Sequence, residues 1–193
     1  FVKQYSRYIY FKLVSTLNLI FLIMKIYTLY TKQNLPISIE KAWSFLSDPK
    51  NLKVITPDYM GFEILSGADR PVFPGQIIQY NVTPVAGINT KWVTEITHVK
   101  HLEYFVDEQR FGPYSLWHHK HFLKEIPGGV EMEDIVDYKV PAGIIGQMVH
   151  PFLVKPKLQE IFEYREKKLT ELFGTYTKPE KELQGVSRED ILN

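Results

Sequence analysis

The order of the predicted elements constrains the fold of this 193-residue chain more than any other feature. Residues 24–34 alternate β-branched and aromatic positions with polar ones at period two, which predicts a strand. Ser38 is placed to cap a short helix that carries Ala42 and Trp43 on one face, and Asp48 and Pro49 begin a second short helix. The chain therefore starts as one strand followed by two short helices.

A run of strands separated by glycine and proline turns follows, as in an antiparallel meander. The predicted strands cover 61–65, 75–82, 89–98, 102–109, 114–125 and 130–140. After Pro141 the apolar period becomes helical, and Gly174 ends one long helix. The stripe of that helix consists of Leu158, Ile161, Phe162, Arg165, Leu169 and Leu172. A kinked approach segment is expected before Lys157, because of the two prolines there.

We therefore predict an α+β fold in which a curved antiparallel sheet of about seven strands surrounds the long C-terminal helix. One helix cannot fill the whole concave face of such a sheet, so a gap suited to a ligand is expected between them. The 12 Tyr, 12 Phe and 3 Trp residues suit an aromatic lining for this gap.

Composition excludes several classes of function. The 23 basic and 22 acidic residues give a net charge of +1, which argues against a broad basic surface for nucleic acid. The absence of cysteine excludes disulfides, zinc–thiolate sites, iron–sulfur clusters and a cysteine nucleophile. No phosphate-binding loop, nucleophile elbow or H-E-x-x-H motif occurs. We predict no cofactor and no metal.

Residues 1–23 differ from the rest, since they contain three basic residues, no acid and an apolar stretch over 13–23. They fit three interpretations: sequence upstream of a domain that begins at Met24, a membrane anchor or signal, or an amphipathic helix. We expect a domain over 24–174, which folds equally well without residues 1–23, and a loose polar tail over 175–193. The expected location is cytoplasmic, with membrane association through residues 1–23 as the alternative.

Hairpin geometry assigns side chains to the two faces of the sheet. A turn near Ala86 pairs Tyr80 with Trp92 and Ile78 with Thr94. A second turn, centred between Gly128 and Gly129, pairs Leu123 with Asp134, His121 with Val136 and His119 with Tyr138. The predicted inward face carries Ile78, Tyr80, Val82, Trp92, Thr94, Ile96, Trp117, His119, His121, Leu123, Val130, Met132, Asp134, Val136 and Tyr138. The predicted solvent face carries Lys91, Glu95, His118, Lys120, Lys124, Glu131, Glu133, Asp137 and Lys139.

His119, His121 and Asp134 are thus polar residues on an apolar inward face. They fit four roles: a structural network with Arg165, polar anchors for a ligand, a general acid and base, or a metal site. His98, His101 and His150 are expected to be ordinary surface or loop residues.

Several motifs together resemble the START/Bet v 1-like superfamily, also called SRPBCC, over about residues 24–173. They are Leu35-Pro36-x-Ser38-x-Glu40-Lys41-x-Trp43-x-Phe45-x-Ser47-Asp48-Pro49-x-Asn51-Leu52 with Thr56-Pro57, Gly112-Pro113-Tyr114, Trp117-x-His119-x-His121, Asp134 with Tyr138-x-x-Pro141, and Ile161-Phe162-x-Tyr164-Arg165. The chain is similar to the bacterial ligand-binding branch, which includes polyketide cyclase-like proteins and proteins described as cell-division inhibitors. The resemblance implies a helix-grip fold of seven strands. It does not imply one activity, and nothing matches the iron ligands of Rieske oxygenases.

Residues and resemblance together predict a protein that binds a hydrophobic small molecule of lipid, polyketide or aromatic type. The expected ligand-binding residues are Tyr80, Trp92, Thr94, Trp117, His119, His121, Asp134, Tyr138, Phe162 and Arg165. One alternative is a cyclase or dehydratase that uses His119 or His121 with Asp134. Another is a regulatory or membrane-associated interaction protein.

Overall fold

A computed structural model describes residues 12, 14, 25–83 and 87–179. The elements are β1 (Tyr27–Leu35), α2 (Ile39–Leu46), the 3₁₀ helices η1 (Pro49–Lys53) and η2 (Asp58–Met60), β2 (Glu63–Ser66), β3 (Gln76–Val82), β4 (Thr90–Lys100), β5 (Tyr104–Phe111), β6 (Leu116–Ile126), β7 (Gly129–Lys139), α3 (Gly143–Val149), the π-helical turn η3 (His150–Val154) and α4 (Lys155–Phe173). The predicted order of elements is confirmed, and η2 is an addition.

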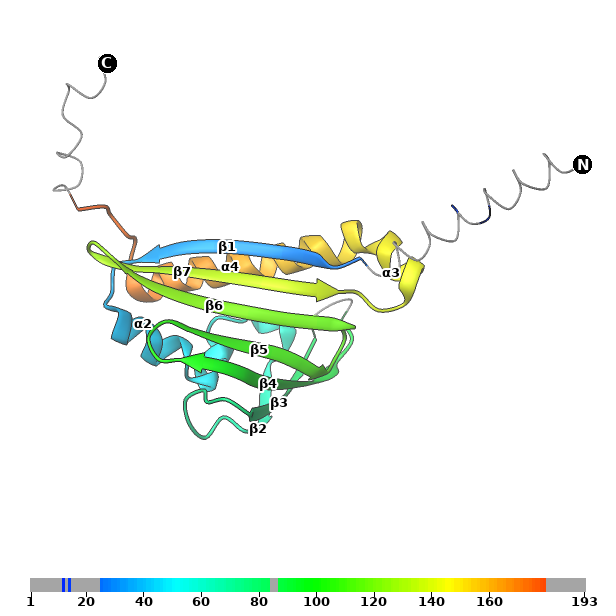
Figure 1. Ribbon diagram of the computed structural model, residues 1–193, viewed down its shortest axis with the longest axis horizontal. Helices are drawn as coiled ribbons and strands as arrows, with labels where there is room; N and C mark the ends of the chain where they lie inside the picture. Colours follow the sequence, from blue (N-terminus) through cyan, green and yellow to red (C-terminus); the bar gives the residue numbers. More distant parts are fainter. Residues whose placement is uncertain (1–11, 13, 15–24, 84–86, 180–193) are drawn as a thin grey trace, which may run out of the picture.

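The seven strands form one antiparallel sheet in the order β1-β7-β6-β5-β4-β3-β2. The sheet curves around α4, which lies along β1 and β7, and α2 covers the other end (Figure 1). The predicted α+β class and the curved sheet of about seven strands are therefore confirmed. Two clusters of buried apolar side chains fill most of the space between sheet and helices.

The two predicted helix starts are formed by their capping side chains. Ser38 Oγ accepts the Lys41 N–H at 3.3 Å, and Asp48 accepts the Lys50 N–H at 3.0 Å. Ala42 and Trp43 are buried, as predicted for one face of α2. Both helices lie at the rim of the cavity in which the candidate site lies.

The register predicted for the β3–β4 hairpin is confirmed, whereas the register predicted for the β6–β7 hairpin is wrong. Tyr80 pairs with Trp92 and Ile78 with Thr94. In the last hairpin Ile126 pairs with Gly129, so the turn consists of Pro127 and Gly128. Gly128 occupies the left-handed region at φ 77°, which its lack of a Cβ permits.

This turn is centred one residue earlier than predicted, so every pair in the hairpin shifts by two positions. His121 faces Asp134, His119 faces Val136 and Trp117 faces Tyr138. A shift of two leaves each side chain on its predicted face, because side chains alternate with period two. The inward assignment of Asp134 is therefore confirmed, with 1% of the residue exposed.

The long helix α4 buries Leu158, Phe162, Arg165 and Leu169. Leu172 is 45% exposed, so the prediction that it extends the buried stripe is wrong. Phe173 instead packs edge-on against Phe45, with ring centroids 5.1 Å apart. The Gly174 N–H bonds to the Thr170 carbonyl at 2.8 Å, and the helix ends there as predicted.

Three predicted segments lie wholly or largely outside the described residues: the leader over 1–23 except residues 12 and 14, the turn at 84–86, and the tail beyond residue 179. Of the tail, residues 175–179 form no helix or strand. The Tyr176 hydroxyl nevertheless donates a hydrogen bond to the Pro127 carbonyl at 2.8 Å. Among the described helices, none is both long and apolar enough to cross a membrane.

Candidate functional site

A partly open cavity of about 180 Å³ lies between the concave face of the sheet and α4. Strands β3 to β6 supply one wall, α4 supplies the other, and α2, η1 and η2 supply the rim. The cavity wall is mostly apolar, with polar members on β4, β5, β6 and α4, and three further polar residues, Asp48, Asn51 and Thr56, lie at the rim. The gap predicted between sheet and helix is thus present in the structure.

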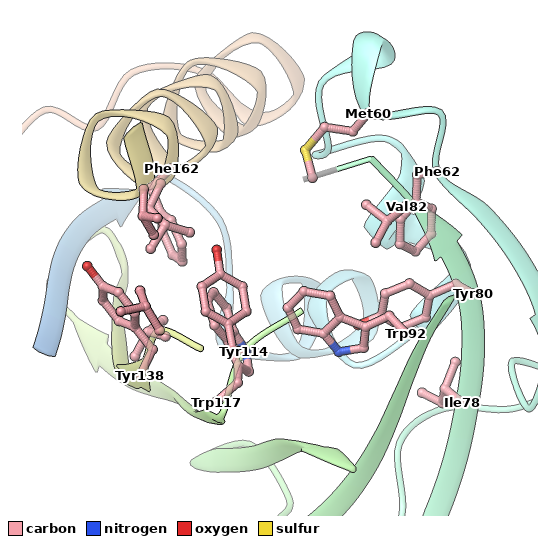
Figure 2. Close-up of a cluster of buried hydrophobic side chains, with 14 of the residues drawn as sticks. Met60, Phe62, Ile78, Tyr80, Val82, Trp92, Tyr114, Trp117, Tyr138 and Phe162 are labelled. Carbon is pink, nitrogen blue, oxygen red and sulfur yellow. The ribbon is translucent and has the colours of Figure 1, made fainter. Parts of the chain in front are cut away.

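Aromatic rings build the apolar half of this cavity wall. Tyr80 stacks on Trp92 with centroids 5.9 Å apart, and Trp92 meets Tyr114 and Trp117 edge-on at 5.7 and 5.3 Å. Figure 2 shows these rings bordering an open space, with Phe162 and Met60 on its other side and the Tyr114 hydroxyl directed toward it. Offset and edge-on packing of this kind holds the rings rigidly, so the wall keeps its shape.

Four titratable side chains and one arginine form a buried cluster at the other end of the cavity. The His119 Nε2 and Asp134 Oδ1 atoms are 3.0 Å apart, and His121 Nε2 and Asp107 Oδ2 are 2.8 Å apart. The two imidazole rings lie against each other, with centroids 3.7 Å apart. Arg165 Nη2 approaches Asp134 Oδ1 at 3.5 Å from α4. The cluster therefore joins β5, β6, β7 and α4.

Two carboxylates set the charge of this cluster. Burial alone would raise the pKa of Asp134, but Arg165 and the two histidines hold that pKa well below its usual value. Burial would also raise the pKa of Asp107, and the hydrogen bond from His121 and the nearby positive charges lower it on balance. Both acids are therefore ionised at neutral pH.

The pKa values of the two histidines are shifted in opposite directions. Burial and the adjacent His121 lower the pKa of His119, which favours its neutral form. Burial also opposes a charge on His121, but the hydrogen bond to Asp107 and the adjacent Asp134 carboxylate outweigh burial and raise its pKa. The raised pKa favours the charged form of His121, which together with Arg165 balances the charges of the two aspartates.

Each imidazole nitrogen lies within 3.5 Å of a carboxylate oxygen. Besides the two hydrogen bonds above, His119 Nδ1 lies 3.5 Å from Asp107 and His121 Nδ1 lies 2.8 Å from Asp134. A general base needs a nitrogen within reach of the proton that it removes. The geometry thus favours the structural and electrostatic roles of the cluster over the acid–base role.

One set of residues has the spacing of a metal site. Ligand atoms of Asp107, His119 and His121 lie within 4.8 Å of one another, so Asp107 takes the place predicted for Asp134 in a candidate set. The Arg165 guanidinium, whose charge also acts on Asp107, competes for that carboxylate and repels a dication. The residues present therefore suit an internal ion-pair network better than a metal ion.

Eight of the ten predicted ligand-binding residues lie in the cavity wall. They are Tyr80, Trp92, Thr94, Trp117, His119, His121, Phe162 and Arg165. Asp134 lies behind the two histidines and outside the wall. Tyr138 also lies outside it, where its hydroxyl makes a 2.7 Å hydrogen bond with His150 Nε2.

The sequence interpretation missed Asp107 and misplaced His150. Asp107 lines the cavity and contacts both histidines, and the only sequence signal for it is its position two residues after the buried Phe105. His150 is 3% exposed and stacks on Tyr27 with centroids 3.5 Å apart, so its prediction as a surface or loop residue is wrong. Burial, with Lys25 and Lys155 nearby, lowers the pKa of His150.

Comparison with known sequences finds no matching family model and no match among curated proteins. Comparison with solved structures finds similar folds. Ms6760 from Mycobacterium smegmatis has a TM-score of 0.55 and 19% identity, over 75% of this chain and 89% of that one. Ginseng major latex-like protein 151 from Panax ginseng has a TM-score of 0.54 and 7% identity, over 77% and 97% of the two chains.

A third similar structure is Ara h 8.0201, a Bet v 1-type allergen. Its TM-score is 0.52 and its identity 17%, over 76% of this chain and 99% of that one. All three similarities extend over most of the solved chain and about three quarters of this one, so they concern the whole fold and not one motif. The chain therefore has the Bet v 1-like helix-grip fold, in which a seven-stranded antiparallel sheet curves around a long C-terminal helix.

Proposed function

We propose that this protein binds a hydrophobic small molecule in the cavity between the sheet and α4. The observation that carries the proposal is the pairing of an aromatic wall with a neutral polar cluster around one cavity of about 180 Å³. A core whose only role is structural would fill such a space, since interiors pack to the density of organic crystals. Burying a ligand there would gain roughly 25 cal/mol per Å² of apolar area.

The size of the cavity favours the aromatic type among the three predicted ligand types. A cavity of about 150 Å³ lined by apolar side chains holds benzene. The present cavity of about 180 Å³ thus suits a ligand of one or two fused rings. A lipid chain or an extended polyketide would need the wall to open further.

Two polar atoms in the wall favour a ligand with one polar substituent. The Tyr114 hydroxyl and Trp92 Nε1 are buried and have no hydrogen-bond partner among the described residues. An unpaired buried donor costs about 1–3 kcal/mol, which a ligand hydroxyl or carbonyl group would recover. The cluster at the other end adds no net charge, so the ligand is expected to be uncharged.

Calorimetric titration with naphthalene, 2-naphthol and 2-naphthoate tests the proposal. We expect the two uncharged probes to bind, 2-naphthol more tightly, and 2-naphthoate to bind least. Ile78 lines the cavity, whereas Ile77 lies on the opposite face of β3 and is 44% exposed. Ile78→Phe should therefore abolish binding while the protein stays folded, and Ile77→Phe should leave it unchanged. Equal binding by both variants would contradict the proposed site.

Native mass spectrometry of the protein purified from its source would identify the natural ligand. We expect a bound mass of a one- or two-ring compound that is lost in Ile78→Phe and kept in Ile77→Phe. A native mass spectrum that shows only the mass of the protein itself, together with no binding of any probe in calorimetry, would count against a binding function.

A further inference from the structure

Large apolar side chains gather in solvent at one end of the molecule. Phe152, Ile145 and Met148 are 84%, 70% and 67% exposed on α3 and η3, and Ile26, Ile88 and Phe111 are also exposed. Scattered single residues of this kind are normal on a protein surface, but a group at one end marks an interaction site.

The strand register places these residues at the same end of the sheet. Tyr27 at the start of β1 pairs with Tyr138 at the end of β7, and Leu116 at the start of β6 pairs with Lys139. Val82 at the end of β3 pairs with Thr90 at the start of β4. Ile26, Ile88 and Phe111 directly flank these strand ends, and α3 follows β7 at the same end (Figure 1).

The helical segment turns one face inward and one outward. Gly146, Gln147, His150 and Val154 are buried against the domain. Ile145, Met148 and Phe152 follow the spacing i, i+3, i+7 on the outer side, where they form a row without a partner among the described residues. We call this row the outer face of α3.

The sequence that carries the outer face is basic. Residues 138–159 contain three lysines and no aspartate or glutamate, and residues 1–39 also contain no acid. Lys25 and Lys155 are exposed, and both lie near enough to His150, on the inner side of the segment, to lower its pKa. An apolar row with basic residues beside it complements a surface that has an apolar interior and anionic groups above it.

We propose that this end of the domain docks on a lipid bilayer that contains anionic lipids. Phe152, Ile145 and Met148 would enter the interface between headgroups and acyl chains, while Lys25 and Lys155 contact lipid phosphates. A second copy of the chain is a poorer occupant, because a symmetric contact would bring the same lysines together. The segment that precedes β1 joins the domain at this end and is itself basic and apolar, which agrees with this orientation.

Co-sedimentation of the full chain with lipid vesicles tests the proposal. We expect the protein to bind vesicles of phosphatidylcholine mixed with phosphatidylglycerol, and to bind phosphatidylcholine alone much more weakly. The triple substitution Ile145→Gln, Met148→Gln, Phe152→Gln should reduce binding about tenfold or more. Lys25→Gln with Lys155→Gln should also reduce it, by about thirtyfold, because each of the two lysines near an anionic surface contributes roughly 1 kcal/mol.

The matched control replaces three exposed apolar residues elsewhere. Leu65→Gln, Ile77→Gln and Leu172→Gln remove side chains that are 44–45% exposed away from this end, and they should leave binding unchanged. Circular dichroism verifies that all variants are folded. Wild-type vesicle binding by the triple variant would overturn the proposal. The proposal would also be overturned if the wild type does not bind vesicles and forms a dimer in solution that the triple substitution dissociates. Neither result bears on the cavity, which the outer face of α3 does not line.

Discussion

Asp134 lies directly opposite His121 in the β6–β7 pair, and its Oδ1 atom is 2.8 Å from His121 Nδ1. The same oxygen is 3.0 Å from His119 Nε2 and 3.5 Å from Arg165 Nη2. One buried carboxylate thus faces three basic side chains. Asp134→Asn should lower the free energy of unfolding by about 3 kcal/mol, because it leaves buried positive charges without their partner. Urea denaturation at neutral pH measures this loss.

Asp137 provides the matched control for Asp134. It lies on the opposite face of β7, is partly exposed and pairs with Lys120 at 2.8 Å. Asp137→Asn should cost less than about 1 kcal/mol, since exposed ion pairs contribute little. Equal losses for the two variants would show that the buried cluster does not stabilise the fold.

The raised pKa of His121 makes part of the stability depend on pH. A group whose pKa is higher in the folded state stabilises the fold below its unfolded value of about 6.5, and this contribution disappears as the pH rises through the folded pKa. As the pH rises above about 6.5, the wild type should therefore lose stability that His121→Gln does not lose. The lowered pKa of His119 has the opposite effect on stability. It destabilises the fold as the pH decreases below about 6.5.

Urea titrations at several pH values separate these contributions. The exposed His98 is the control, and His98→Gln should keep the wild-type slope of unfolding free energy against pH. An unchanged slope in His121→Gln would mean that the charge of the cluster does not reside on His121.

The Tyr138–His150 hydrogen bond tests the corrected position of His150. The bond is 2.7 Å long and buried, and burial raises the pKa of Tyr138 to about 12. Tyr138→Phe should cost about 1–3 kcal/mol, because it leaves a buried imidazole nitrogen unpaired. Tyr30→Phe removes an exposed hydrogen bond to Glu133 and should lower stability much less than Tyr138→Phe does. Thermal unfolding that ranks the two variants in the reverse order would place His150 in solvent.

Gly146 fixes how closely α3 approaches the end of β7. A Cβ atom at this position would lie 1.8 Å from the Pro141 carbonyl oxygen, so the helix would have to move. Gly146→Ala should therefore cost at least about 2 kcal/mol in urea denaturation. Ile145→Ala, on the exposed side of the same helix, should change stability by less than about 0.5 kcal/mol. A neutral Gly146→Ala would indicate that α3 packs loosely.

Sequence reasoning located most of the fold because its strongest signals are local. Ser38, Asp48 and Gly174 act on the backbone within one helical turn, and each performs its predicted role. The face of the sheet on which each hairpin side chain lies also follows from alternation along the strand. A register error of two residues does not change this face. That error arose because Pro127-Gly128-Gly129 offers two adjacent positions for the turn, and only the three-dimensional contacts select one of them.

The missing site residues depend on contacts that local patterns do not record. Phe105 and Val106 are both buried, so the strand that carries Asp107 has no clear polar face, and bulges in the β4–β5 pair obscure its alignment further. His150 begins a π-helical turn that contains Pro151, where neither the helical nor the strand period applies. Its burial depends on Tyr27, which is more than a hundred residues away in sequence.

The pairing of β1 with β7 has a consequence for cotranslational folding. Within the described part of the chain, β1 pairs with β7 alone, which is synthesised roughly a hundred residues later. At about 5–20 residues per second, β1 spends about 5–20 s as a nascent segment without that partner. Thr28, Tyr30, Lys32 and Asn34 keep one side of β1 largely polar during this wait, which limits mispairing with other chains before the sheet can close.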